Sequence, residues 1–229
     1  MVFRALILAA LVALGGCAGS WDTRSNKSGN SSQGQSAPNT GIYVVRPGDT
    51  FYSIAFRYGI AQADLARWNR LSDVSRIYPG QKLRLTKPPA GQVAAPPPRP
   101  PVVPVASWRW PTDGRLVAEF DVGAKVKRTG VLIGGKIGQP IFASADGEVV
   151  YAGSGLKGYG KLVIIQHTPN YLSAYGHNAA LLVNEGDTVR SGQKIATMGE
   201  TAAQKPRLHF EIRRDGQPID PMPLLRSGR

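Results

Sequence analysis

Residues 87–106 constrain the fold of this chain more than any other segment, because they contain eight prolines. Such a composition favours extended polyproline II structure, at ~3.1 Å per residue, and gives a semi-rigid spacer. Residues 19–40 are rich in Ser, Gly, Asn and Gln and have almost no large apolar residues, which predicts flexibility. We therefore expect two folded units, residues 42–86 and residues 108–229, joined by a proline-rich linker at residues 87–107.

The N-terminus has the layout of a secretory signal peptide at residues 1–16, with a charged start, an apolar run and small residues before a cleavage site. The apolar run, residues 5–14, is too short to span a bilayer, which needs ~20 such residues. We therefore expect the mature chain to begin after this segment.

The four residues Leu-Gly-Gly-Cys that end at Cys17 resemble a bacterial lipobox, in which the cysteine is lipidated and becomes the first residue of the mature chain. Because Ala18 is uncharged, the resemblance implies a lipid anchor in the outer membrane, facing the periplasm, with residues 17–41 as a flexible tether. The alternative is a signal peptide that happens to end beside a buried cysteine. Cys17 lies in no periodic pattern, however, and it is the only cysteine of the chain.

The chain is strongly basic, with 28 Lys and Arg against 15 Asp and Glu, a formal net charge of +13. A charge of this size indicates an anionic partner. Export argues against nucleic acid. The bacterial cell wall, whose peptide stems carry carboxylates, is therefore the expected polyanion.

The small unit is expected to have the order strand, helix, helix, strand. Residues 42–46 and residues 81–85 read as strands, while the apolar side chains of residues 51–58 recur at helical spacing and residues 62–69 fit a second helix. The sequence YVVRPGDTFYSIAFRYG…LARWN…IYPGQKLRL resembles a LysM domain over the whole unit. One departure is Ala61, which stands where the second helix usually has a capping Ser or Thr.

LysM domains bind N-acetylglucosamine in a groove formed by two loops, so the resemblance implies peptidoglycan as a partner. The implied glycan-binding residues lie in the two corresponding loops: Gly48, Asp49, Thr50, Phe51, Ile77, Tyr78, Pro79 and Gly80. Many of these loop residues are also needed to form turns, so a purely structural role is the alternative.

The larger unit consists of short apolar runs separated by Gly, Asp and Pro, and it offers no long helical stripe. Strands at this spacing predict an antiparallel sandwich or open barrel. The expected strands are residues 117–120, 131–133, 141–143, 148–152, 162–167, 171–175, 194–198 and 208–213.

The sequences GVLIGGKIGQPIFASADGEVVYAG, GYGKLVIIQH, YLSAYGH and RLHFEIRRDGQPIDP resemble the LytM-type M23 zinc metallopeptidase domain from Trp108 to about Leu225. The resemblance implies an antiparallel β domain built on a duplicated hybrid motif. The fold class expected for the whole chain is therefore mainly β, with a small βααβ LysM domain and an M23-type domain joined by the proline-rich linker.

Active members of the M23 family cut peptidoglycan with a zinc-bound water, using the motifs H-x-x-x-D, H-x-H and Y-x-H. In this chain Arg128 and Leu132 stand at the two metal ligands of the first motif. Arg207 stands at the first His of H-x-H, whereas the ligand His209 and the Y-x-H residue His177 are kept. Because zinc catalysis needs three protein ligands and leucine has no lone pair to donate, the resemblance implies no catalytic residue, no metal and no cofactor. A substitute site made of the three histidines, including His167, is the alternative.

A groove that has lost its metal can still bind a partner. The domain combination resembles the NlpD-like family of inert LytM proteins, which activate the periplasmic N-acetylmuramyl-L-alanine amidases that split daughter cells. Arg128, Arg207 and Arg213 offer forked donors suited to carboxylates of a partner helix or a peptide stem, although Arg213 could also be a solvated strand end. Two other functions stay open: an M23 metalloendopeptidase with an altered metal site, and a passive peptidoglycan-binding scaffold.

Overall fold

The structure is a computed structural model that describes residues 41–89, 104–123 and 128–226. The predicted signal peptide, the predicted lipidation residue Cys17, nearly all of the predicted tether and most of the proline-rich linker lie outside the described residues. Within the described part of the chain, no helix is long and apolar enough to cross a membrane.

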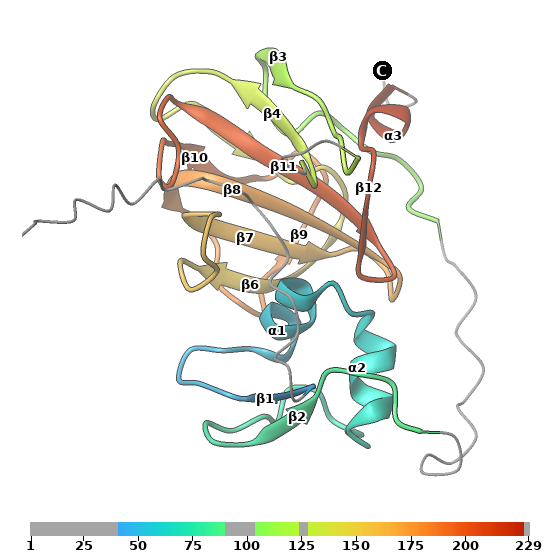
Figure 1. Cartoon of the computed structure of the whole chain (residues 1–229). Coiled ribbons are helices and arrows are strands. Elements are labelled where there is room, and N and C mark those ends of the chain that lie inside the picture. Colours follow the sequence, from blue (N-terminus) through green and yellow to red (C-terminus); the bar gives the residue numbers. More distant parts are fainter. Residues whose placement is uncertain (1–40, 90–103, 124–127, 227–229) are drawn as a thin grey trace, which may run out of the picture.

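The small domain has the expected βααβ order (Figure 1). Its elements are β1 (Ile42–Val44), α1 (Phe51–Tyr58), α2 (Gln62–Trp68) and β2 (Lys82–Arg84), and β1 pairs with β2 in antiparallel fashion. Thr50 and Ser53 form a reciprocal capping box that begins α1, and Gly59 ends it in the left-handed conformation at φ 64°. Ala61, by contrast, offers no side-chain cap to α2.

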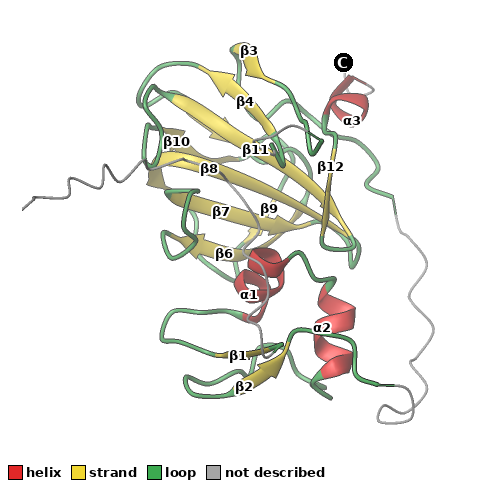
Figure 2. Cartoon of the chain, viewed as in Figure 1, coloured by secondary structure: helices red, strands yellow, loops and turns green. Residues whose placement is uncertain are grey.

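The large domain is an antiparallel β-sheet domain, which confirms the expected fold class (Figure 2). The strand order is β3-β4-β11-β8-β7-β6-β9, with β10 paired to β5 and β8 and with β12 paired to β11. The elements are β3 (Arg115–Ala118), β4 (Val131–Gly134), β5 (Pro140–Phe142), β6 (Gly147–Gly153), β7 (Lys161–Gln166), β8 (Tyr171–Leu181), β9 (Thr188–Val189), β10 (Lys194–Met198), β11 (Arg207–Arg214), β12 (Gln217–Ile219) and α3 (Met222–Arg226).

Strand β8 is longer than the sequence predicts. We expected a strand at residues 171–175. The strand continues to Leu181, since Gly176 and Asn178 still pair with the neighbouring strands. The additional residues carry His177 into the centre of the sheet domain.

The two domains pack against each other, which the linker composition does not predict. Helix α1 lies against β6 in Figure 1. Phe56 of α1 is buried among large-domain side chains, and its ring centroid lies 5.4 Å from that of Tyr159. The β11–β12 turn completes the contact, because a Cβ atom on Gly216 would lie 2.5 Å from the backbone of Ile60. The turn therefore approaches the small domain as closely as a glycine permits.

Candidate functional site

Three neighbouring strands bring together the residues that the M23 motifs single out. Across the sheet, His209 of β11 lies opposite Leu132 of β4 on one side and opposite Gly176 of β8 on the other. The ring centroids of His177 and His209 are 5.7 Å apart, with an interplanar angle of 74°. The structure thus unites Leu132, His177 and His209 in one place.

His177 has a strained backbone and a neutral side chain. Its φ of 66° lies in the left-handed region, which costs a non-glycine residue about 1 kcal/mol or more unless the surroundings impose it. Its backbone N–H donates to the carbonyl of Tyr159 at 2.8 Å, and its Nδ1–H donates to the carbonyl of Thr201 at 2.7 Å. Burial, together with the nearby His209 and Arg207, lowers the pKa of His177 to about 4. At neutral pH the Nε2 atom therefore keeps its lone pair.

A buried carboxylate holds the second histidine. Glu211 of β11 is completely buried, and its Oε1 accepts hydrogen bonds from His209 Nε2 at 2.8 Å, from the hydroxyl of Tyr159 at 2.9 Å and from the hydroxyl of Thr129. Its Oε2 accepts from Arg213 Nε at 2.8 Å. Burial alone would raise the pKa of Glu211, but the ion pair with Arg213 and the hydrogen bonds lower it to about 2.

Glu211 is a site residue that the sequence analysis missed. Its signal is a charged residue in the middle of LHFEIRR, a segment that otherwise reads as a buried strand. A charge at such a position needs a buried partner, because an unpaired charge in the interior is very costly. Arg213, two residues along the same face of the strand, provides that partner.

Arg213 differs from the expectation that it presents a free fork of donors to an outside partner. Only 3% of the residue is exposed, because the small domain covers it. Its Nη1 donates to the backbone carbonyl of Phe56 at 2.6 Å, and its Cζ lies 3.5 Å from the centroid of the Phe56 ring. With Nε and Nη2 bonded to Glu211 and Tyr159, the guanidinium joins the site to the small domain. The alternative of a solvated strand end does not hold for Arg213 either, although it describes the exposed neighbour Arg214.

The other two arginines lie nearer to the surface. The side chain of Arg128 is 41% exposed and pairs with Asp121, with 3.2 Å between Nη2 and Oδ2, while its Nε donates to the carbonyl of Glu119. Arg207 is half-buried at the start of β11, close enough to His177 to depress its pKa. Among the described residues, the Nε atom of Arg207 has no hydrogen-bond partner.

The described residues do not fit a zinc ion at this position. No group of three His, Cys, Asp or Glu side chains in residues 41–89, 104–123 and 128–226 is placed to hold a metal. Leu132, which faces His209, has no lone pair to donate. His167 cannot join the two other histidines from its position, because its ring lies against Trp108 and bonds to Asp146 and Ser173.

The eight loop residues expected to bind glycan divide into two groups in the small domain. Thr50 caps α1, Phe51 is buried in the core, and Asp49 pairs with Arg57 at 2.9 Å, so these three have structural roles. The tips of the two loops are more open: Tyr78 is 63% exposed, and Ile77 is half-buried. The remaining loop residues are all exposed: Gly48, Pro79 and Gly80. Backbone hydrogen bonds from Val45 to Gln81 and from Gly80 to Val45 hold the two loops side by side.

Comparison with known families and proteins supports the resemblance expected for each of the two domains. Residues 126–221 match Peptidase family M23, and residues 43–86 match the LysM domain. A crystal structure of a zinc containing peptidase from Vibrio cholerae resembles the chain with a TM-score of 0.50 and 28% identity, over 52% of this chain and 40% of that one. The large domain thus has the fold of M23 peptidases.

Two relatives share more of the sequence. The lipoprotein NlpD/LppB homolog of Pseudomonas aeruginosa is 41% identical, over 81% of this chain and 77% of the relative. The murein hydrolase activator NlpD of Salmonella dublin is 51% identical, over 53% of this chain and 32% of the relative. The chain, which joins a LysM domain to an M23 peptidase-like domain, therefore belongs to the NlpD/LppB family of proteins.

Proposed function

We propose that this protein binds peptidoglycan and activates a periplasmic N-acetylmuramyl-L-alanine amidase during cell division, without hydrolysing peptidoglycan itself. The observation that carries the proposal is the pairing of Leu132 with His209 in an otherwise preserved M23 fold. A domain that keeps this fold while Leu132 and Arg128 stand at two of the three zinc-ligand positions is suited to binding rather than to metal catalysis. The name of the Salmonella relative, a murein hydrolase activator, supports the same function.

The proposed partner surface is the rim of the site, where Arg128 and Arg207 are partly exposed, because His177 and His209 are themselves buried, at 2% and 4% exposed. One ring nitrogen of His177 bonds to Thr201 and one ring nitrogen of His209 bonds to Glu211, and these hydrogen bonds fix the orientation of the two rings. Arg207 supplies positive charge near His177, and arginine is suited to bidentate recognition of a carboxylate. Arg128 shares its guanidinium with Asp121, and it precedes Thr129, whose hydroxyl bonds to Glu211. We therefore propose an acidic segment of the amidase as the docking partner.

The proposed location is the outer membrane, facing the periplasm. The support is the lipobox-like sequence at Cys17 and the lipoprotein name of the Pseudomonas relative. The LysM domain would then hold the tethered protein against the cell wall. The proposed lipid anchor and the proposed contact with the cell wall would together place the M23-like domain where a periplasmic amidase works.

Release of dye from labelled peptidoglycan sacculi tests this function. The purified protein alone should release no dye, whereas the protein with a cognate amidase should release far more than the amidase alone. Arg207→Glu should raise the concentration needed for half-maximal activation by about tenfold or more, because it reverses a charge at the proposed contact. Arg214→Glu, an exposed charge reversal on the same strand, is the matched control and should behave as wild type.

Two outcomes would contradict the proposal. One bound zinc per chain, with hydrolysis that is lost in His209→Ala, would make the protein an enzyme with a rebuilt metal site. Equal amidase activity with and without the protein would favour a passive scaffold.

A further inference from the structure

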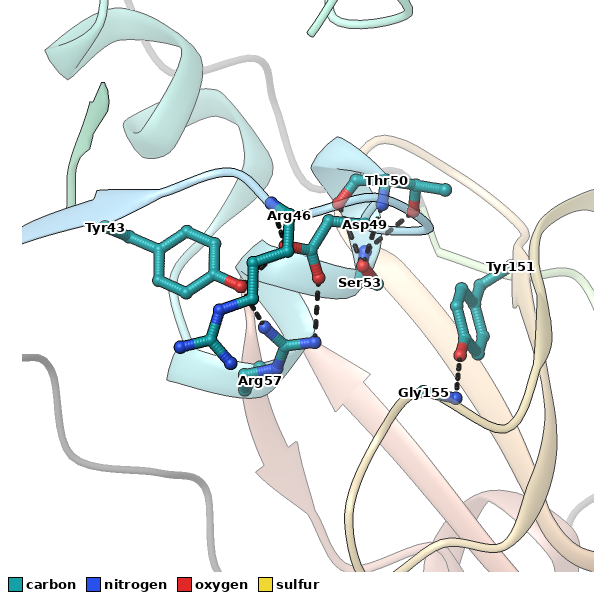
Figure 3. Close-up of polar contacts among 8 residues, drawn as sticks. All are labelled: Tyr43, Arg46, Asp49, Thr50, Ser53, Arg57, Tyr151 and Gly155. Carbon is teal, nitrogen blue, oxygen red and sulfur yellow. Dashed lines mark hydrogen bonds and ion pairs between the residues drawn. The ribbon is translucent and has the colours of Figure 1, made fainter. Parts of the chain in front are cut away.

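A second polar cleft lies between the two domains, away from the degenerate metal site. Its volume is about 720 Å³, and both domains line it. The LysM side contributes the segment from Arg46 to Asp49, and the M23-like side contributes residues 151–155 and Lys157. Figure 3 shows Tyr43, Arg46 and Arg57 from the LysM domain on one side and Tyr151 with Gly155 on the other.

The domain contact holds this cleft in a defined shape. Phe56 is buried in the large domain, and Arg213 clamps its carbonyl at 2.6 Å. A second bond, from Gln217 Nε2 to the carbonyl of Gly59 at 2.6 Å, fixes the end of the same helix. Because α1 is anchored at both points, the β1–α1 loop that contains Arg46 stays opposite the β6–β7 connection.

The floor of the cleft on the LysM side is preorganised. Asp49 accepts hydrogen bonds from the hydroxyl of Tyr43 at 2.6 Å, from the backbone N–H of Arg46 at 2.9 Å and from Arg57 Nη2 at 2.9 Å. Arg57 Nη1 also donates to the Tyr43 hydroxyl at 2.7 Å. A fully bonded network of this kind keeps its geometry when a ligand binds and loses little entropy in doing so.

Two cations in the cleft have no such partner. Arg46 and Lys157 are both exposed, and no acceptor among the described residues bonds to the guanidinium of the first or to the ammonium of the second. The Cζ atom of Arg46 lies 5.9 Å from the centroid of the Tyr43 ring, a contact that uses no hydrogen-bond donor of the guanidinium. The only charge that opposes them in the cleft is Glu185, since Asp49 is already paired with Arg57. Glu185 itself accepts the backbone N–H of Ala152 at 3.2 Å. The cleft is therefore positive and offers free donors from both domains.

The loop that lines the cleft also belongs to the proposed glycan site. Gly48 and Asp49 lie in the first of the two loops that the LysM resemblance assigns to glycan, and they line the cleft as well. A glycan strand bound across the loops would therefore place its substituents beside Arg46 and Lys157. The peptide stems of peptidoglycan carry carboxylates, and such groups match unpaired cations.

We propose that this cleft binds a carboxylate-bearing peptide attached to the glycan that the LysM loops hold. Arg46 and Lys157 contact the carboxylate from opposite domains, and Glu185 disfavours excess negative charge at the rim. The domain contact thereby makes one binding site out of the LysM loop and the M23-like domain. This inference rests on the proposed binding of peptidoglycan, but it does not depend on activation of an amidase.

Calorimetric titration of the full-length protein with defined peptidoglycan fragments tests the proposal. The probes are a disaccharide that carries a tetrapeptide with free carboxylates, the same fragment with its carboxylates amidated, and a chitotetraose without peptide. Wild type should bind the free-acid fragment most tightly. Arg46→Gln and Lys157→Gln should each weaken that binding by about fivefold, as expected for a partly exposed charge contact, and should leave chitotetraose binding unchanged.

Two further variants sharpen the test. Glu185→Gln should strengthen binding of the free-acid fragment, because it removes the opposing charge, and Lys194→Gln, an exposed cation on β10 outside the cleft, should change nothing. Equal affinity for the acid and amidated fragments, or unchanged affinity in the Arg46→Gln and Lys157→Gln variants, would overturn the proposal. If one of these two results were found together with full activation of the amidase, only the proposed binding in the cleft would be refuted, and the proposed function would be kept. Selective binding of the free-acid fragment without activation of the amidase would support the proposed binding in the cleft and refute the proposed function.

Discussion

Arg213 is the residue whose replacement most sharply tests the interior of the candidate site. Arg213→Met keeps the length and apolar volume of the side chain but removes its ion pair with Glu211, its hydrogen bond to the Phe56 carbonyl and its contact with the Phe56 ring. Glu211 would then remain completely buried without a countercharge. Removal of one partner of a buried pair costs about 3–5 kcal/mol, because the remaining charge loses its compensation.

The pKa of Glu211 gives a comparable magnitude. Its value of about 2 in the folded protein, against ~4.3 for an unperturbed glutamate, corresponds to about 3 kcal/mol of stability at neutral pH. Because the folded pKa is the lower one, this contribution is present above about pH 4 and is lost as the pH falls towards 2. Arg213→Met should remove it, so the variant should be destabilised at pH 7 by about 3 kcal/mol or more.

Urea unfolding at pH 7, followed by tryptophan fluorescence, measures this effect. Arg213→Met combined with Glu211→Gln should recover part of the loss, since the double variant no longer buries a charge. The control is Arg214→Met at the exposed neighbouring position, which should stay within about 0.5 kcal/mol of wild type. A change below about 1 kcal/mol for Arg213→Met would refute the reasoning, because it would mean that the guanidinium is not buried in the ion pair.

Three other predictions concern pH, the domain contact and the anchor. Burial lowers the folded pKa of His177 to about 4, so its protonation should cost about 3 kcal/mol of stability as the pH falls from 6.5 to 4. His177→Asn should remove this share from the pH dependence of urea unfolding and leave the share of His167, whose pKa burial also lowers to about 4; an unchanged pH dependence would contradict this. Phe56→Ala should open the domain contact and accelerate amide hydrogen exchange in β6, whereas unchanged exchange would mean that Phe56 does not hold the domains together. Cys17→Ser should abolish lipidation and move the protein out of the membrane fraction, and retention of the protein there with an unchanged mature mass would refute the lipobox assignment.

Periodicity and turn residues predicted most of the fold. The βααβ order of the small domain follows from the spacing of apolar residues, which a sequence expresses directly. The domain contact was not predicted, although Phe56 carried a signal. It lies outside the apolar stripe that runs from Phe51 to Tyr58, so an amphipathic helix with one buried face leaves it unexplained. Which surface would cover it depends on distant residues, and the linker composition contains no such information.

The candidate site was predicted in part. Alignment to short motifs located Leu132, His177 and His209, and the strand register places all three together. The same alignment could not reveal that Arg213 is buried. Alternation along a strand shows which face of the sheet a side chain lies on, but it does not show whether another part of the protein covers that face. That covering comes from the LysM domain, and it changes Arg213 from a proposed partner contact into a structural ion pair. Glu211 escaped notice because a motif search looks for metal ligands and not for the carboxylate that holds one of them.

Mass spectrometry of the products released from sacculi tests the central claim most directly, because it identifies the bond that is cut. With the protein and a cognate amidase together, the account predicts free stem peptides that begin with L-alanine and glycan strands without peptides, in amounts well above those from the amidase alone. With the protein alone, it predicts no released fragments. Fragments cut within the peptide cross-bridges in the absence of amidase would contradict the account and show that the M23-like domain hydrolyses peptidoglycan itself.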